Sequence, residues 1–132
     1  MKLSIIVPAF NEEKCLPETL EKVKDASVAA NCDSEVIVVD NDSTDKTGEI
    51  AKLHRATVIF EKEHNIGRVR NAGAKAATGE TFVFIDADTR IPAELLQKIC
   101  EAITDEKCYG GAVAVGYENF ERKWMRYYTE II

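Results

Sequence analysis

The sequence predicts an α/β domain built on a mostly parallel sheet flanked by helices. Short runs rich in β-branched and apolar residues recur along the chain, and their continuous apolarity indicates strands buried on both faces. Helical patterns separate these runs, and this alternation predicts right-handed βαβ units. Cap-type and turn residues stand between the two kinds of segment. The expected strands are Leu3–Val7, Val36–Val39, Thr57–Phe60 and Phe82–Ile85, followed by a late strand at Gly111–Tyr117.

Four helices are expected between and after these strands, near residues 13–29, 45–54, 67–77 and 92–103. The run Asp42–Thr44 consists of cap-type residues and precedes the second helix. Gly79 follows the third helix as a C-terminal stop. Pro92 suits the first turn of the fourth helix, where its missing N–H costs nothing.

Length and charge limit the classes of protein to consider. A chain of 132 residues, 45% hydrophobic and 30% charged, is long enough for one domain with a core and too short for two. Its net charge of −6 argues against a nucleic-acid partner, because such proteins need a basic surface. An anionic ligand would therefore have to be bound by local groups.

The cysteines and the N-terminus favour a cytoplasmic protein. Cysteines at positions 15, 32, 100 and 108 form no CxxC pair and have no histidine at zinc-ligand spacing, so we expect reduced thiols and no zinc site. Met1–Val7 lacks the length and cleavage site of a signal peptide. No segment approaches the roughly 18 apolar residues of a membrane helix. Membrane association of a longer parent protein stays open.

The tail from Asn119 to Ile132 carries an aromatic stripe at helical spacing. Something must cover such a stripe, and both a homodimer through the tail and a tail folded onto its own sheet fit the pattern. Because the last residues are apolar, we expect the chain to be truncated. Residues 1–118 would form the α/β domain and 119–132 an amphipathic helix. The stripe consists of Trp124, Tyr127, Tyr128 and Ile131.

Acidic residues gather where the predicted strands end. Ligands of an open parallel sheet bind outside the carboxyl ends of its strands, so these segments should lie at one edge. Asp86 and Asp88, at i and i+2 of an extended segment, can point the same way and bind Mg²⁺ or Mn²⁺ together with phosphates. The alternative is that they only cap a strand end. The segments are Pro8–Glu13, Asp40–Asp45 and Asp86–Asp88.

The main basic concentration, Lys62–Asn71, stands at the start of the third helix. Helix amides, Gly67 and the forked guanidinium of Arg68 could all act on a diphosphate, whereas Arg70 and Lys75 fit a solvated helix face better. His64 is more typical of a surface residue than of a base.

Asp40 has two possible roles at the end of the second strand. Its carboxylate could accept the imide N–H of a uracil. It could instead cap the next helix, although Asp42 or Ser43 could do that.

Four segments in this order resemble the family 2 inverting glycosyltransferases of GT-A fold, which is Rossmann-like. The resemblance covers Ser4 to about Leu96 and implies that residues 1–118 bind a nucleotide sugar. It implies that Pro8, Phe10, Glu12 and Asp40 line the nucleoside pocket, Arg68 lies near the diphosphate, Asp86 lies near the ribose and Asp88 binds the metal. The segments are SIIVPAFNEE (Ser4–Glu13), EVIVVDNDSTD (Glu35–Asp45), NIGRVRNAG (Asn65–Gly73) and TGETFVFIDADT (Thr78–Thr89).

This resemblance implies transfer of a sugar from a nucleoside diphosphate sugar, with UDP favoured, to an acceptor hydroxyl of a sugar or lipid-linked molecule. Family members carry a general base in a later acceptor-binding half, and no residue here matches it. Residues 119–132 would lead towards that half. Two other functions stay open: a nucleotidyltransferase, although its basic glycine-rich N-terminal loop is missing, and a non-catalytic nucleotide-binding or assembly module.

Overall fold

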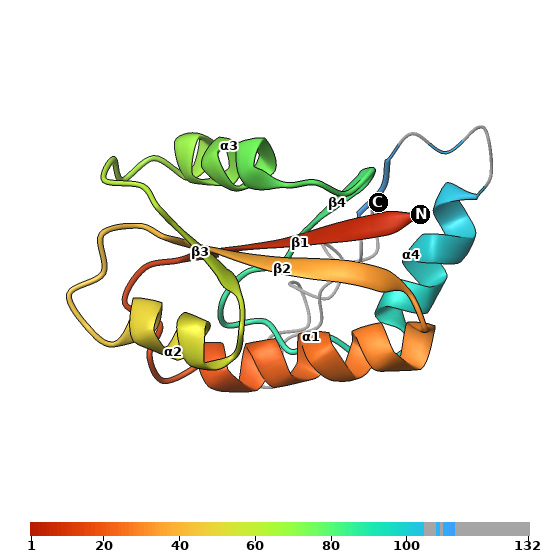
Figure 1. The fold of residues 1–132 in the computed structure, drawn as a ribbon, viewed down its shortest axis with the longest axis horizontal. Helices are drawn as coiled ribbons and strands as arrows, with labels where there is room; N and C mark the ends of the chain where they lie inside the picture. The colour runs from red at the N-terminus through yellow and green to blue at the C-terminus, as the bar shows by residue number, and fades with distance from the viewer. Residues whose placement is uncertain (105–107, 109, 113–132) are drawn as a thin grey trace, which may run out of the picture. The chain divides into compact units, whose positions relative to one another are not determined.

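A computed structural model describes residues 1–104, 108 and 110–112, and it confirms the α/β class with a parallel sheet. Residues Met1–Cys100 form one compact unit. The four strands pair in the order β3-β2-β1-β4, and every pair is parallel (Figure 1). In chain order the elements are β1 (Lys2–Ala9), α1 (Leu16–Ala30), β2 (Asp33–Asp40), α2 (Thr47–Leu53), β3 (Thr57–Phe60), α3 (Ile66–Ala76), β4 (Thr81–Phe84) and α4 (Leu95–Ile103).

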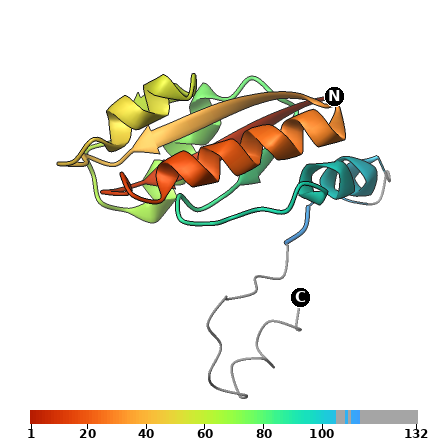
Figure 2. The same ribbon diagram turned by 90° about the horizontal axis from the view of Figure 1, so that it is seen from below.

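Helices cover both faces of the sheet. Figures 1 and 2 show α1 and α2 on one face and α3 on the other. The central strands therefore have no solvated face, which explains their unbroken apolar sequence. Ile5, Ile6 and Val7 of β1 are fully buried, and so are Val38 and Val39 of β2.

Gly73 allows α3 to lie close against the sheet. Val69 of α3 packs with Ile6 and Val39 in one buried cluster. A Cβ on Gly73 would stand 3.0 Å from Val39 Cγ2 and closer still to Ile6 Cγ2. The helix can approach these strands only because this position has no side chain.

Three expectations about helix ends were wrong. α4 begins at Leu95, because Pro92 sits in a preceding turn whose carbonyl accepts the Leu95 N–H at 3.1 Å. Before α2 the N-cap position is Lys46, which makes no side-chain cap, rather than a residue of Asp42–Thr44. α3 ends before Ala77, so Gly79 does not stop that helix.

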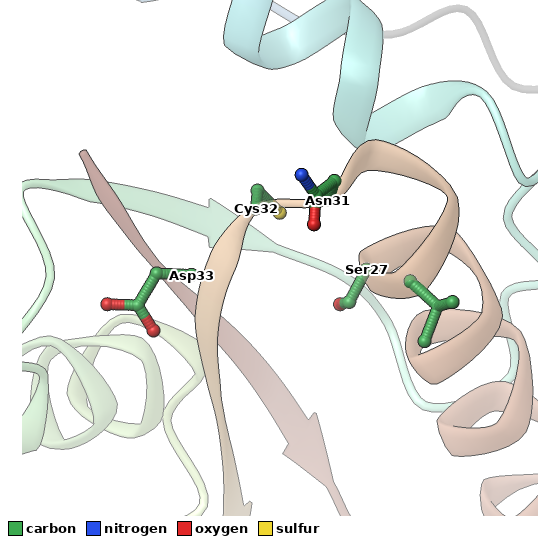
Figure 3. Close-up of a pocket in the computed structure, with 5 residues that line it drawn as sticks. Ser27, Asn31, Cys32 and Asp33 are labelled. Carbon is green, nitrogen blue, oxygen red and sulfur yellow. The ribbon is translucent and has the colours of Figure 1, made fainter.

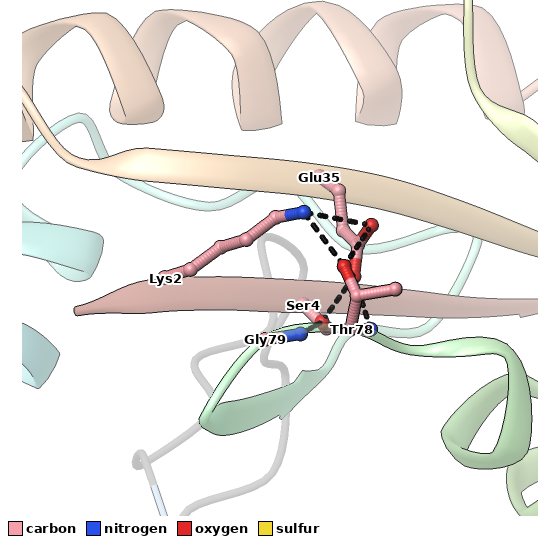
Figure 4. A network of polar contacts seen from close by, with 5 residues as sticks. All are labelled: Lys2, Ser4, Glu35, Thr78 and Gly79. Atoms are coloured by element: carbon pink, nitrogen blue, oxygen red, sulfur yellow. Dashed lines mark hydrogen bonds and ion pairs between the residues drawn. The ribbon is translucent and has the colours of Figure 1, made fainter.

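Gly79 instead belongs to a polar cluster at the edge where the strands begin, which we call the amino edge (Figure 4). Glu35 Oε1 accepts hydrogen bonds from Ser4 Oγ and from the Thr78 N–H, both at 2.6 Å. Lys2 Nζ lies 3.2 Å from Glu35 Oε2. The Ser4 hydroxyl, aided by the Thr78 N–H, lowers the pKa of Glu35 from 4.5 to about 2. This cluster ties β1, β2 and the segment before β4 together.

Other expectations fall partly or wholly outside the described residues. Of the late strand only Gly111 and Ala112 are described, and neither is in a strand. The boundary at residue 118 and the aromatic helix at 119–132, with the homodimer expected through it, lie outside the described part. All four cysteines are free. In the part of the chain that the structure describes, no helix has both the length and the apolarity that crossing a bilayer requires.

Candidate functional site

The structure places every predicted site residue at the edge where the parallel strands end, which we call the carboxyl edge. Pro8 is the second-last residue of β1, and Ala9, the last, is paired with Asp40 at the end of β2. The segment Asp86–Asp88 follows β4, which neighbours β1 on its other side. The loop after β1 therefore lies between the loop after β2 and the Asp86–Asp88 segment.

The loops after β1 and β2 are joined by side-chain hydrogen bonds. The Asn11 N–H donates to Ser43 Oγ at 3.0 Å, and the Thr44 N–H donates to Asn11 Oδ1 at 2.8 Å. The Glu12 N–H donates to Thr47 Oγ1 at 2.9 Å. Asn11 has a φ of 50° and Asp42 a φ of 60°, conformations that Asn and Asp tolerate better than most residues. The two loops form one rigid unit that presents Phe10 and Glu12.

Asp40 lies at the carboxyl edge and also stabilises the loop that precedes α2. Its Oδ1 accepts the Ser43 N–H at 3.0 Å, so the carboxylate shapes the loop before α2. Oδ2 lies against α2, where a Cβ on Gly48 would approach it to 2.9 Å. Gly48 therefore leaves room for this carboxylate. The capping alternative for Asp40 is wrong, because its carboxylate bonds to the loop residue Ser43 and α2 has no side-chain cap.

The sequence reasoning did not single out Asn41, and it interpreted His64 as a surface residue, which is exposed in the structure. Asn41 is 8% exposed, and its Nδ2 donates to the carbonyls of Glu61 at 2.7 Å and Glu63 at 2.9 Å. This holds the β3–α3 loop against the end of β2. From that loop the His64 ring meets the half-exposed Phe10 ring edge-on, with 4.7 Å between centroids. Only the position of Asn41 just past the end of a predicted strand could have pointed to it.

Exposed and buried side chains alternate along the Asp86–Asp88 segment, as expected for an extended backbone. Ala87 is 3% exposed and faces inward, whereas Asp86 and Asp88 are exposed. Arg70 Nη2 lies 3.7 Å from Asp86 Oδ1, and its guanidinium carbon lies 5.7 Å from the centre of the Phe84 ring. Arg70 is exposed, as expected for a solvated helix face, but it also has these two partners. Phe84 is the last residue of β4 and Asp86 follows it, so the spacing within α3 could not reveal them.

Arg68 lies in the first turn of α3, where its guanidinium is 3.9 Å from Glu61 and 63% exposed. Its backbone N–H donates to Asn65 Oδ1 at 3.1 Å, so Asn65 caps the helix and uses one of the amides expected to hold phosphate. A Cβ on Gly67 would approach Asn65 Oδ1 to 3.2 Å, so Gly67 accommodates this cap. The Arg68 side chain stays available to an anion at the carboxyl edge.

Carboxylates at this edge crowd one another. Burial, followed by the negative charges of Asp88 and Asp45, raises the pKa of Glu12 above its usual value. Burial acts the same way on Asp45, but hydrogen bonds from the hydroxyl and N–H of Thr47 and from the Glu13 N–H outweigh it and hold the pKa of Asp45 low. A cation near Glu12 and Asp88 would relieve this repulsion.

The donor set fits a hard divalent cation that shares its coordination sphere with a ligand. Within residues 1–104, 108 and 110–112, no three His, Cys, Asp or Glu side chains come together closely enough to hold a metal by themselves. Mg²⁺ needs no such cage, because it commonly uses one or two carboxylates together with waters and substrate phosphates. Asp88, whose charge acts on Glu12, and Asp86, two residues earlier in the chain, can supply carboxylates of that kind.

A hollow elsewhere in the fold does not belong to this site. It is lined by Ser27, Val28 and Asn31 at the end of α1 and by Cys32 and Asp33 at the start of β2 (Figure 3). Asp33 begins β2, so the hollow lies towards the amino edge.

Known proteins are similar to this chain both in sequence and in fold. Residues 4–131 match Glycosyl transferase family 2. The chain is 35% identical over 121 residues to a dolichol-phosphate mannosyltransferase of Pyrococcus furiosus, which covers 88% of this chain and 33% of the relative. The structure of Staphylococcus aureus TarS in complex with UDP-GlcNAc matches with a TM-score of 0.68 and 32% identity, covering 80% of this chain and 32% of that one.

The mannosyltransferase PcManGT from Pyrobaculum calidifontis, solved with GDP-Man and Mn²⁺, matches with a TM-score of 0.72 and 26% identity, covering 79% of this chain and 32% of that one. The chain thus spans about a third of the length of the two mannosyltransferases and of the solved TarS fragment 1–349, and 19% of TarS as a whole. The match along nearly the whole chain and the shared sheet agree with each other, and this chain belongs to glycosyl transferase family 2, with the α/β architecture of the GT-A fold.

Proposed function

We propose that this chain binds the nucleoside diphosphate part of a sugar donor, with UDP favoured, at the carboxyl edge together with Mg²⁺ or Mn²⁺. It is the donor-binding part of an enzyme that transfers the sugar to an acceptor hydroxyl with inversion. One observation carries the proposal: the sheet order brings Asp40, Glu12 and Asp88, which are far apart in the sequence, to the same edge. The TarS structure with UDP-GlcNAc and the PcManGT structure with GDP-Man and Mn²⁺ support it.

Each side chain has a definite task in this proposal. The half-exposed Phe10 ring offers a face on which the base stacks, and Asp40 accepts an imide N–H of the base. Pro8 and Glu12 line the same pocket. Asp86, held by Arg70, lies near the ribose, and Arg68 donates to the diphosphate. Asp88 would hold the metal, which neutralises charge on the departing diphosphate when it is bound. Residues 1–118 form this donor-binding domain.

The test is a calorimetric titration of the 132-residue chain with UDP and with GDP, each in the presence of Mn²⁺ and of EDTA. UDP should bind more tightly than GDP, and Mn²⁺ should strengthen binding. Asp88→Ala should abolish the strengthening by Mn²⁺, an expected loss of at least about 100-fold, or about 2.8 kcal/mol. The matched control is Asp33→Ala, which removes the same charge from an exposed position at the amino edge and should change nothing. Equal UDP affinity of Asp88→Ala and the parent chain would refute the metal assignment.

Asp40 is tested by Asp40→Asn, because asparagine keeps the Oδ1 that accepts the Ser43 N–H. UDP affinity should fall about tenfold, since the neutral amide is a weaker acceptor than the carboxylate. The ratio of affinities with and without Mn²⁺ should stay the same. If discrimination between UDP and GDP survives intact, Asp40 does not contact the base. Incubation with UDP-GlcNAc, followed for release of UDP, separates an enzyme from a binding module.

A further inference from the structure

We propose that Thr19 of α1 is a positioning residue that holds the Asp86–Asp88 segment ready for the metal and the diphosphate. The proposal rests on the proposed function. Thr19 is 1% exposed, and its hydroxyl donates to the Ala87 carbonyl at 2.6 Å across 68 residues of sequence. Ala87 is the residue between the two aspartates. A single hydroxyl from α1 therefore holds the backbone of the residue that lies between the two aspartates.

The Asp86–Asp88 segment has few other anchors. β4 ends at Phe84, and the Ile85 N–H makes one more bond to the sheet, to the Ile6 carbonyl at 3.0 Å. The Thr89 N–H donates at 3.0 Å to the Asp86 carbonyl, a bond inside the segment itself. The Arg70–Asp86 ion pair is 3.7 Å long and half exposed, so solvent weakens it. The Thr19 bond is buried and neutral, and it acts on the backbone.

Electrostatics explains why this segment needs such an anchor. Asp88 acts on Glu12 at the carboxyl edge through like-charge repulsion. A neutral donor can hold the Ala87 carbonyl in place without adding charge to the site. Holding the ligands in their bound arrangement lowers the cost of ordering them on binding, and outer-shell groups of this kind typically contribute 10–100-fold to metal affinity.

Ser27, on the same helix, provides a control that distinguishes a positioning role of Thr19 from ordinary helix packing. Its hydroxyl donates to the Val23 carbonyl, four residues earlier, at 2.9 Å. Thr19 has the equivalent partner, the Cys15 carbonyl, at a longer 3.2 Å. A hydroxyl has one proton to donate, and the 2.6 Å distance assigns it to Ala87. Ser27→Ala therefore removes a hydroxyl from α1 without touching the site.

The experiment compares Thr19→Val, Thr19→Ser and Ser27→Ala in the 132-residue chain. UDP affinity is measured calorimetrically with saturating Mn²⁺ and with EDTA, below the melting temperature of each variant. Thr19→Val keeps the side-chain volume and loses the donor, so its affinity with Mn²⁺ should fall about tenfold while its affinity in EDTA stays within about twofold. Thr19→Ser restores the hydroxyl and should stay within about threefold of the parent chain. Ser27→Ala should match the parent chain under both conditions.

Each outcome decides a different point. If the UDP affinity of the parent chain is the same with Mn²⁺ and with EDTA, the proposed function itself is contradicted. If Mn²⁺ strengthens UDP binding by the same factor in the parent chain and in Thr19→Val, Thr19 has no positioning role. Equal losses with Mn²⁺ and EDTA, or a Thr19→Ser variant as weak as Thr19→Val, would show a merely structural role and overturn the proposal. If Thr19→Val does not fold, Thr19→Ala replaces it with the same expected result.

Discussion

The two edges of the sheet use carboxylates in opposite ways. At the amino edge Glu35 accepts hydrogen bonds from Ser4, Thr78 and Lys2, and its pKa is lowered to about 2. At the carboxyl edge burial and the neighbouring acids Asp88 and Asp45 raise the pKa of Glu12. One carboxylate is fully matched by donors of its own chain, whereas the other lies among like charges.

This difference separates acids that are paired within the chain from acids to which the proposed function assigns a ligand. A carboxylate that is paired within the chain contributes to stability and has little left to offer a ligand. Carboxylates that repel one another cost free energy until a cation arrives, so their arrangement indicates function rather than stability. Substitutions at the amino edge should therefore lower the free energy of unfolding, and substitutions at the carboxyl edge should weaken nucleotide binding.

The largest expected effect in this comparison is that of Gly79→Ala at the amino edge. The new Cβ would lie 2.7 Å from the Lys2 carbonyl oxygen and 2.8 Å from the Ser4 nitrogen, and neither backbone atom can move without disturbing β1. Such overpacking should lower the free energy of unfolding by about 3 kcal/mol, measured by urea denaturation. The matched control is Gly110→Ala, which meets nothing within 4 Å and should leave stability unchanged. A Gly79→Ala variant as stable as this control would show that the amino edge is loosely packed.

The next effect concerns Glu35→Gln, which keeps one acceptor oxygen but places an amide NH₂ near Lys2. We expect a loss of about 2 kcal/mol in the free energy of unfolding at neutral pH, because hydrogen bonds to a charged acceptor are replaced by weaker ones. The control Glu21→Gln makes the same change on the exposed face of α1 and should have no effect.

The parent chain should also lose stability in acid through Glu35. Because the pKa is lower in the folded state than the ordinary 4.5, the unfolded state takes up the proton first, and the stabilisation is lost as the pH falls from about 4.5 to about 2. Glu35→Gln should be less sensitive to pH in this window. Parallel stability curves for the two proteins would contradict the role given to Glu35.

The smallest effect is expected for Gly48→Ala at the carboxyl edge. The new Cβ would lie 2.9 Å from Asp40 Oδ2, a side-chain atom that can move. Alanine is also the better helix former by up to about 1 kcal/mol, so stability should change little. The displaced Asp40 carboxylate should weaken UDP binding about fivefold, or about 1 kcal/mol, by calorimetry. Unchanged UDP affinity would mean that the position of Asp40 does not matter to the nucleotide, and a large loss of stability would contradict the separation of the two edges.

The sequence by itself determined the fold class, the four strands and the edge at which the chemistry gathers. Continuous apolar runs indicate strands buried on both faces, and the residues directly after them must lie where parallel strands end. Both inferences use information that is local in the chain. For this reason Asp40, Glu12 and Asp88 could be assigned to one edge before any coordinates were known.

Only the tertiary structure decided which groups hold these residues in place. Three kinds of contact join residues that are far apart in sequence. They are the Thr19–Ala87 hydrogen bond, the Arg70–Asp86 ion pair and the hydrogen bonds between the loops after β1 and β2. The role of Gly79 likewise depends on Ser4, 75 residues away. Side-chain periodicity reports which face of an element is buried, but it carries no information about the partner that the buried face meets. Those partners are set by how the elements pack. The residues that hold the site in place could therefore be identified only from the tertiary structure.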